Sequence, residues 1–499
     1  MKKNRLVWIY LGLFLLFSSP LFGQGYFRGS NLLEYQLGNI PSLKPEYQSS
    51  LYDQLNLSYK YKSFTFQTRI EQYYPSFGDD INYIKISQYR ANYKSKELSI
   101  TIGNLYSMFG TGLLMRTYEI PGSIWEDRGY RVRYGFYKDL EGAEINYKLG
   151  KFKLKGVYGR ILDVALPPTL DNDNRRSDLI QGAELSYQNK KLLLGAIFMN
   201  HKNATISDNY TSAYFKNSFS KSFSFYGEFA IKAGSDANLT FENDSAYSIY
   251  LSFNYIKNKI GVSLELKEYN NFSIGTGISD PPTLVKEHSY KLLNRSTHVP
   301  ILTFERGYQI ELYYQLPKNG LITINNSLAQ NKLTSSDSPV FKEIFIEYKF
   351  NIGNKITNQV FIDYSSDPFI NETNRYSGGF IFDMDHNKMN SVFETQLQFI
   401  EREVIETSTF NNMYFSYSLN TGNKLSSTLL LEMSNDPFLL NNNEKYIFYP
   451  GAALSYKPNN KNNIILFYGK RRGGPACNSG VCYDVLDFQG LEIRIMSNF

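Results

Sequence analysis

The side chains in this sequence best suited to chemistry are the charges gathered in one segment, residues 107–138. The segment mixes arginines and acidic residues of both kinds with one tryptophan and a short apolar patch. Fixed charges of both signs on a loop folded into a pore would set a transverse field and a size limit. Two interpretations stay open: a constriction loop in a pore, or an outer lid whose charges pair locally. Its arginines and acidic residues are Arg116, Glu119, Glu126, Asp127, Arg128, Arg131 and Arg133.

The two cysteines, Cys477 and Cys482, flank the four residues Asn-Ser-Gly-Val. Such a flexible turn lets the two thiols meet and close a small ring. In an oxidising compartment such as the periplasm they would be joined. We therefore expect a structural disulfide, and no redox role, because the C-x-x-C motif is absent.

The histidines give little sign of a metal site. His288 and His298 lie ten residues apart, with Glu287 beside the first, in the Pro-containing segment 271–305. A metal needs two to four ligands that converge on one point. We expect no metal, no cofactor and a surface loop here. The G-x-S-x-G, P-loop and H-E-x-x-H motifs are also absent, so we expect no enzyme.

Composition narrows the class of protein that must position these residues. The chain has 499 residues, of which 16% are aromatic and 20% charged, and this is too apolar for a disordered chain. Its mean hydropathy of −0.37, with no second long apolar run, excludes a bundle of transmembrane helices. The net charge is +6 without a basic cluster, so we expect no nucleic-acid partner.

The first 23 residues have the pattern of a secretory signal peptide. Lys2, Lys3 and Arg5 precede the apolar run 6–17, and Gly23 suits the cleavage position. We expect residues 24–499 to be exported and to form a single domain.

The rest of the chain alternates apolar and polar residues with period two, as in 247–255 and 259–267. Strict alternation is typical of strands with two different environments. Very short polar turns join pairs of strands, and longer connections holding most of the prolines separate the pairs. This asymmetry is typical of an outer-membrane β-barrel with short periplasmic turns and long outer loops. Counting hairpins predicts 24 strands, with a range of 20 to 26.

Strands that face lipid must close into a barrel, because an open edge would leave backbone groups without partners. The apolar side then faces the outer-membrane lipid, and the charged side faces a wet lumen of mixed sign with an acidic excess. Besides the charges of 107–138, the pore-lining candidates are Arg69, Glu71, Arg90, Glu265, Lys267 and Glu311.

The chain ends in an alternating segment, 489–499, whose last residue is Phe499. This segment resembles the terminal strand by which Gram-negative barrels are recognised, so we expect the barrel-assembly machinery as a partner. The stretches GGPACNSGVC and RGYRVRYGFYKDLEGAEINYK, with the hairpin layout, resemble an uncharacterised family of Bacteroidota outer-membrane barrels. That resemblance implies a transmembrane barrel in the outer membrane. It gives no indication of the substrate.

The sequence favours a channel or transporter for small polar solutes. The alternative is a barrel that scaffolds a secretion component or a surface lipoprotein, in which case a protein partner or plug would occupy the lumen.

Overall fold

The wall of the molecule is one closed antiparallel sheet. The computed structural model describes residues 25–41, 46–75, 81–127, 129–234, 245–331, 338–440, 444–478 and 481–499. In this part of the chain 24 strands form the sheet, each hydrogen-bonded to both neighbours. They are β1 (Tyr26–Asn39), β2 (Gln48–Tyr61), β3 (Phe64–Pro75), β4 (Tyr83–Lys94), β5 (Leu98–Leu105), β8 (Leu140–Leu149), β9 (Phe152–Ile161), β10 (Leu179–Gln188), β11 (Leu192–Lys202), β12 (Ser207–Ser218), β13 (Phe223–Lys232), β14 (Tyr247–Lys257), β15 (Ile260–Asn270), β16 (Phe304–Gln315), β17 (Leu321–Asn331), β18 (Val340–Ile352), β19 (Ile356–Asp367), β20 (Glu372–Asp385), β21 (Met389–Glu403), β22 (Thr407–Thr421), β23 (Leu425–Ser434), β24 (Ile447–Asn459), β25 (Asn462–Arg471) and β28 (Phe488–Asn498).

The first and last strands close the barrel. β1 pairs with β2 on one side and with β28 on the other, in antiparallel register from Ser30 opposite Asn498 to Asn39 opposite Gln489. Just past the end of β28, Phe499 exchanges two backbone hydrogen bonds of 2.9 Å with Gly29 of β1. No edge is therefore left unpaired at the seam, as burial in lipid requires.

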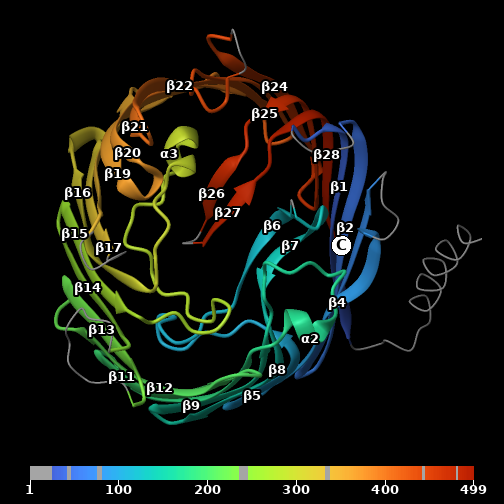
Figure 1. Cartoon of the computed structure of the whole chain (residues 1–499), viewed down its shortest axis with the longest axis vertical. Helices are drawn as coiled ribbons and strands as arrows, with labels where there is room; N and C mark the ends of the chain where they lie inside the picture. The colour runs from blue at the N-terminus through green and yellow to red at the C-terminus, as the bar shows by residue number, and fades with distance from the viewer. Residues whose placement is uncertain are drawn as a thin grey trace, which may run out of the picture.

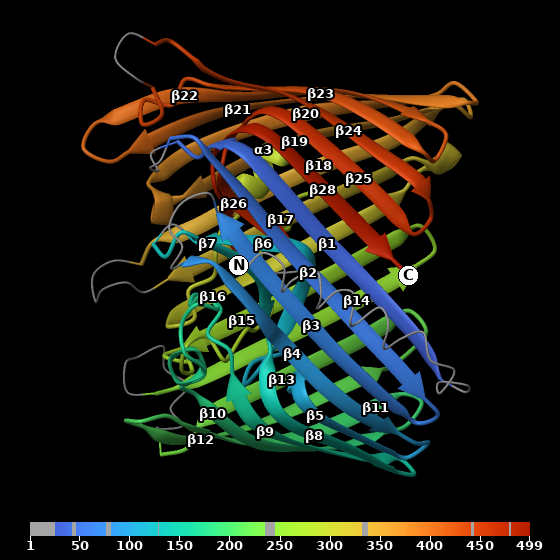
Figure 2. The ribbon, with the colours of Figure 1, turned by 90° about the vertical axis from the view of Figure 1, so that its right-hand side faces the viewer.

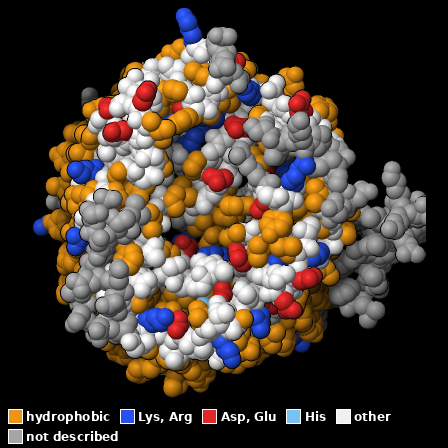
Figure 3. Space-filling view, viewed as in Figure 1, with side chains coloured by type: hydrophobic (Ala, Val, Ile, Leu, Met, Phe, Trp, Pro, Cys, Tyr) orange, Lys and Arg blue, Asp and Glu red, His pale blue; other side chains and the backbone are white. Residues whose placement is uncertain are grey.

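Side chains alternate between the lumen and the outside along each wall strand. On β19, Asp363 and Ser365 are buried towards the lumen, whereas Val360 and Ile362 lie on the outer face, where Ile362 is 59% exposed. The outer face is rich in isoleucine, leucine, phenylalanine and tyrosine (Figure 3). No helix among the described residues is long and apolar enough to cross a membrane.

The two ends of the barrel differ, and the strands are strongly tilted between them (Figure 2). Short turns at one end reverse the chain within a few residues. Four of them place a non-glycine residue in the left-handed region, namely Lys62 at φ 50°, Asn258 at φ 54°, Asn319 at φ 63° and Asn387 at φ 70°. The other end carries the long connections.

Several of the long connections fold back into the barrel instead of standing above it (Figure 1). We call residues 106–139, 271–303 and 472–487 together the lumen plug. The first contains the hairpin β6 (Tyr118–Asp127) and β7 (Val132–Lys138), the second the helix α3 (Lys291–Arg295), and the third the hairpin β26 (Gly474–Asn478) and β27 (Val481–Val485). The remaining short elements are α2 (Asn172–Arg175), η3 (Pro317–Asn319) and η4 (Pro368–Ile370).

The plug segments are joined to one another. Backbone bonds link Arg116 N to Ile278 O (3.1 Å) and Asp280 N to Gly112 O (3.1 Å), which ties the first segment to the second. The hydroxyl groups of Ser123 and Tyr483 lie 3.1 Å apart and tie the first to the third. The plug is thus one packed body within the wall.

The structure confirms the predicted closed barrel and its strand number. The first strand begins at Tyr26, and the last wall strand begins at Phe488, just before the alternating segment 489–499. The expectation that 271–305 is a surface loop is wrong, since most of this segment is plug. The signal peptide predicted at 1–23 lies outside the described residues.

Candidate functional site

A polar chamber of about 940 Å³ lies inside the barrel at the end with the short turns. Strands β1 to β5 and β28 line it, together with part of β6. Its charged side chains are Arg28, Arg69, Arg90, Lys461 and Glu119, so four are basic and one is acidic. Its uncharged polar side chains include Ser30, Gln54, Asn56, Ser58, Gln67, Gln88, Asn104 and Tyr106.

The two arginines at the centre of this chamber have different partners. Arg69 Nη2 donates to Glu119 Oε1 of β6 at 2.5 Å, and its Nε donates to Asn56 Oδ1 at 2.6 Å. Arg90 Nε donates to the amide oxygen of Gln67 at 2.7 Å. Because the amide of Gln67 is neutral, this contact does not compensate the positive charge of Arg90. The chamber therefore offers positive charge and many amide groups to a solute.

The first plug segment is bound to the wall by buried charges. Arg133 forms ion pairs with Glu34 of β1 and, at 3.1 Å, with Glu126 of β6. On the opposite side of the segment, the backbone N–H and the hydroxyl of Thr111 both donate to Glu228 of β13 at 2.7 Å. Pairs of this kind are costly to break, because each leaves a buried charge without a partner.

The second plug segment is bound in the same way along β16 to β23. Five of its contacts join a polar side chain of the segment to a carboxylate that the alternation places inside the barrel. These pairs are Lys286 with Glu311, His288 with Glu343, Tyr290 with Glu347, Arg295 with Glu432, and His298 with Asp367.

Other predicted site residues are also placed in or beside the lumen. Glu71 is fully buried, and Gly135 of β7 packs closely against both Glu71 and Tyr52. Lys267 of β15 pairs with Glu305 of β16, and both side chains are fully buried. Glu265 lies on the same face of β15 as Lys267.

The remaining charges of the first segment serve the plug itself. Arg116 pairs with Asp280 of the second segment at 3.3 Å. Asp127 accepts a 2.8 Å bond from the backbone of Tyr130 in the β6–β7 turn, where Arg131 has a φ of 58°. Arg128 lies outside the described residues. The pore-lining role of all these residues stays a prediction.

The third plug segment carries the predicted disulfide, which joins Cys477 and Cys482. The two residues face each other across the β26–β27 pair. Asn294 beside them, in α3, donates to Cys477 O and accepts from Cys477 N, each at 3.0 Å. The hairpin is therefore held to the second segment by side-chain contacts that mimic a strand pairing.

Two carboxyl groups in the connections have shifted acidity. Burial raises the pKa of Asp178, but hydrogen bonds from His201 and Thr276 outweigh it and hold this pKa well below its usual range. Burial raises the pKa of Asp280, and the nearby Lys138 and Arg116 offset only part of that rise. Asp178 thus remains an anion that tethers Thr276 of the plug to His201 of the wall.

Comparison with known proteins identifies the family. A model described as a family of unknown function, DUF6029, matches residues 39–499. The chain belongs to the DUF6029 family. The expected uncharacterised family is thereby shown, and its occurrence in Bacteroidota stays a prediction. No curated protein matches the DUF6029 chain.

Solved structures resemble the DUF6029 chain in fold alone. The translocation pore of the P pilus usher PapC is 10% identical, with a TM-score of 0.48, over 95% of this chain and 99% of that one. The outer membrane protein opdK of Pseudomonas aeruginosa is 11% identical, with a TM-score of 0.40, over 75% and 99%. OccK3 of the same organism is 12% identical, with a TM-score of 0.39, over 81% and 96%.

Sequence reasoning missed several partners of the plug in the DUF6029 chain. Glu34, Asp280 and Arg375 were not singled out, although alternation along β1 and β20 could have placed Glu34 and Arg375 inside the barrel. What no local pattern reveals is their pairing, because Glu34 and Arg133 are 99 residues apart in the chain.

Proposed function

We propose that this protein is an outer-membrane channel for small polar solutes, and that anions pass more readily than cations. The observation that carries the proposal is the polar chamber inside a closed barrel, with four basic side chains and one acidic side chain on its walls. A channel selects by pore size and by the charges that line it. A solute with a carboxylate would find guanidinium and amide donors there, and a cation would be repelled.

The lumen plug supports a small size limit. Space-filling atoms cover most of the mouth that carries the long connections and leave a hollow near its centre (Figure 3). Folded proteins would need the plug to leave. The plug also occupies the room that a partner chain would need, so the scaffold alternative has less support than the channel.

The location follows from the same physics. The apolar outer face suits hydrocarbon, and residues 1–23 would direct export before cleavage. The seam strand β28, ending at Phe499, would present the assembly signal to the barrel-assembly machinery.

Solute flux into liposomes that contain the purified protein tests this proposal. Gluconate, glucose and glucosamine have similar sizes and carry negative, zero and positive charge. We expect all rates to exceed those of empty liposomes and to fall in that order. Rates equal to those of empty liposomes for all three would contradict the channel, and a glucosamine rate above the gluconate rate would contradict the anion preference.

Arg90→Gln tests the residue that we expect to contribute most. The change removes one positive charge from the chamber, so we expect the ratio of gluconate to glucosamine flux to fall by about half or more. Lys96→Gln is the matched control, because Lys96 is exposed in the short turn between β4 and β5 at the same end. An equal fall in both variants would show that the charge of the chamber does not select.

A further inference from the structure

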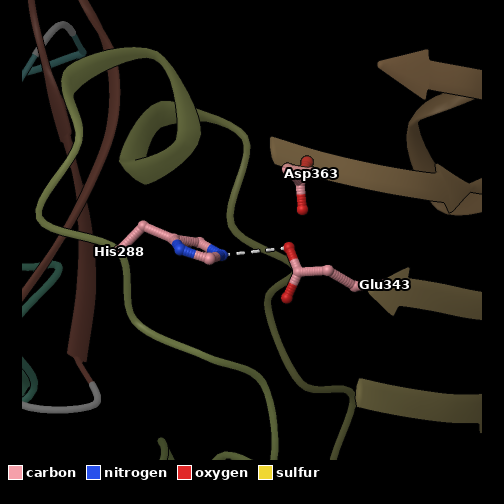
Figure 4. A group of neighbouring side chains, drawn as sticks. All are labelled: His288, Glu343 and Asp363. Carbon is pink, nitrogen blue, oxygen red and sulfur yellow. Dashed lines mark hydrogen bonds and ion pairs between the residues drawn. The ribbon is translucent and has the colours of Figure 1, made fainter. Parts of the chain in front are cut away.

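Three potential metal ligands converge where the second plug segment meets the wall. His288 comes from the plug, Glu343 from β18 and Asp363 from β19, and the three side chains point towards one another (Figure 4). One ligand atom from each lies within 4.8 Å of the other two. His288 Nε2 and Glu343 Oε1 are 3.1 Å apart.

The cluster is sealed from solvent and short of hydrogen bonds. The side chains of His288, Glu343 and Asp363 are 1%, 2% and 0% exposed. Within the described part of the chain, no hydrogen bond of good geometry reaches Glu343 Oε2 or either carboxylate oxygen of Asp363, beside which the Ser377 hydroxyl lies. Buried carboxylate oxygens normally accept a hydrogen bond or bind a cation. Glu343 and Asp363 would therefore be stabilised by a further cation or proton.

The charges around the cluster do not balance. Arg375 lies 3.7 Å from Glu343, 3.8 Å from Asp363 and 3.4 Å from Glu372, so one guanidinium is shared by three carboxylates. Arg402 is likewise shared by Glu372 and Asp436. Four carboxylates thus face two guanidinium groups. Lys286, the next cation, is already paired with Glu311.

The neighbouring cluster around His298 contains the same residue types, and its own side chains balance its charges. There Asp367 lies 3.2 Å and Glu305 3.5 Å from the imidazole. Lys267 forms a fully buried ion pair with Glu305 and supplies the positive charge. In the His288 cluster, within the described part of the chain, the corresponding cation is Arg375, which lies farther from its carboxylates, at 3.7 Å and 3.8 Å, and is shared with Glu372.

We propose that His288, Glu343 and Asp363 bind one divalent transition-metal ion of the Zn²⁺ class. An imidazole nitrogen with two carboxylate oxygens is a common ligand set for zinc, with ligand distances of about 2.0–2.2 Å. The ion replaces the hydrogen bond between His288 and Glu343 and adds the charge that the surrounding carboxylates lack. Phe345 packs on His288 with ring centroids 4.7 Å apart and keeps the site dry.

The ion would act as a clamp, since it joins the plug to two adjacent strands of the wall. Metal–ligand bonds are formed only in the folded state, so an occupied site stabilises the attachment of 271–303. The proposal concerns how the plug is held and does not depend on which solutes pass.

Zinc binding by the full chain in detergent tests the proposal. The protein is stripped with a chelator, incubated with Zn²⁺ alone, freed of excess by gel filtration and analysed for metal. We expect about one zinc per chain in the wild type, and less than about a tenth in His288→Gln and in Asp363→Asn. Asp363→Asn keeps the shape of the side chain, so it serves if His288→Gln does not fold.

His298→Gln is the matched control, because it removes an imidazole from the same plug segment and should keep the zinc. A second readout is the visible absorption of bound Co²⁺, which reports direct nitrogen and oxygen ligands and should disappear in the same two variants. A wild type that holds no zinc would overturn the proposal, as would zinc retained by both His288→Gln and Asp363→Asn.

Discussion

At the scale of single residues, the inward carboxylates of the wall serve mainly as anchors. Alternation predicts that Glu311 and Glu228 face the lumen, and they do. The expected wet lining is nevertheless only part of the picture, because both carboxylates bind plug side chains. Breaking a buried pair of this kind costs about 3–5 kcal/mol, because one charge stays behind without a partner.

The seam of the barrel depends on close backbone approach at Gly38. A Cβ at this position would lie 2.1 Å from the carbonyl oxygen of Gln489 on β28. We expect Gly38→Ala to force β1 and β28 apart and to lower stability by about 1–3 kcal/mol. The temperature at which the folded barrel changes its gel mobility measures the effect. Gly261→Ala is the control, because its nearest neighbour would be an ordinary contact at 3.6 Å; equal stability of the two variants would contradict the account.

The attachment of the second plug segment should depend on pH through His298. Burial alone would lower the pKa of His298, but hydrogen bonds to Asp367 and Glu305 outweigh burial and raise it. A raised pKa stabilises the folded state fully below the unfolded value of about 6.5, and this stabilisation is lost as pH rises through the folded pKa. Lys267, which pairs with Glu305, also faces this group.

We therefore expect residues 271–303 to exchange amide hydrogens, after correction for intrinsic rates, more slowly at about pH 6 than at about pH 9. His298→Gln should remove most of that difference. His386→Gln should not, because His386 is exposed in a turn between β20 and β21. An unchanged pH difference in His298→Gln would exclude His298 as the cause.

At the scale of elements, the sequence predicts the wall far better than the plug. Period-two alternation is a local property, so each wall strand can be recognised from its own residues. The plug hairpins depend on distant contacts instead. Phe136 of β7 stacks on Trp125 of β6 and packs at a tilt against Tyr483 of β27, and nothing near Tyr483 in the chain indicates that partner. The choice between constriction loop and outer lid could not be made for this reason.

The hairpin β26–β27 is the element that the disulfide supports. Cys477 and Cys482 close a short ring, so we expect Cys477→Ser with Cys482→Ser to cost about 2 kcal/mol through loop entropy. Because Asn294 still holds β26, the loss should stay local, with amide exchange in β26 and β27 about 30-fold faster. Thermal unfolding of the wall should not change. A large fall in the unfolding temperature of the whole barrel would show that the hairpin supports the wall.

At the scale of the whole molecule, lipid surrounds an apolar wall, and the wall encloses a polar lumen that its own connections narrow. Closure satisfies the backbone of the wall, and plug contacts satisfy much of the buried charge within it. The chamber beside β1 to β5 is the space that these contacts leave open. Selectivity in this account comes from the chamber, and the size limit comes from the plug.

The conductance of single molecules in planar bilayers tests this account most directly. Tyr118 and Lys138 pair at the base of the β6–β7 hairpin, so residues 119–137 can be replaced by a short Gly-Ser linker without stretching the chain. We expect the intact protein to give small current steps and the shortened protein, folded by gel mobility, to give steps several times larger. Equal steps would contradict the role of the plug, and the absence of current from both proteins would contradict the channel itself.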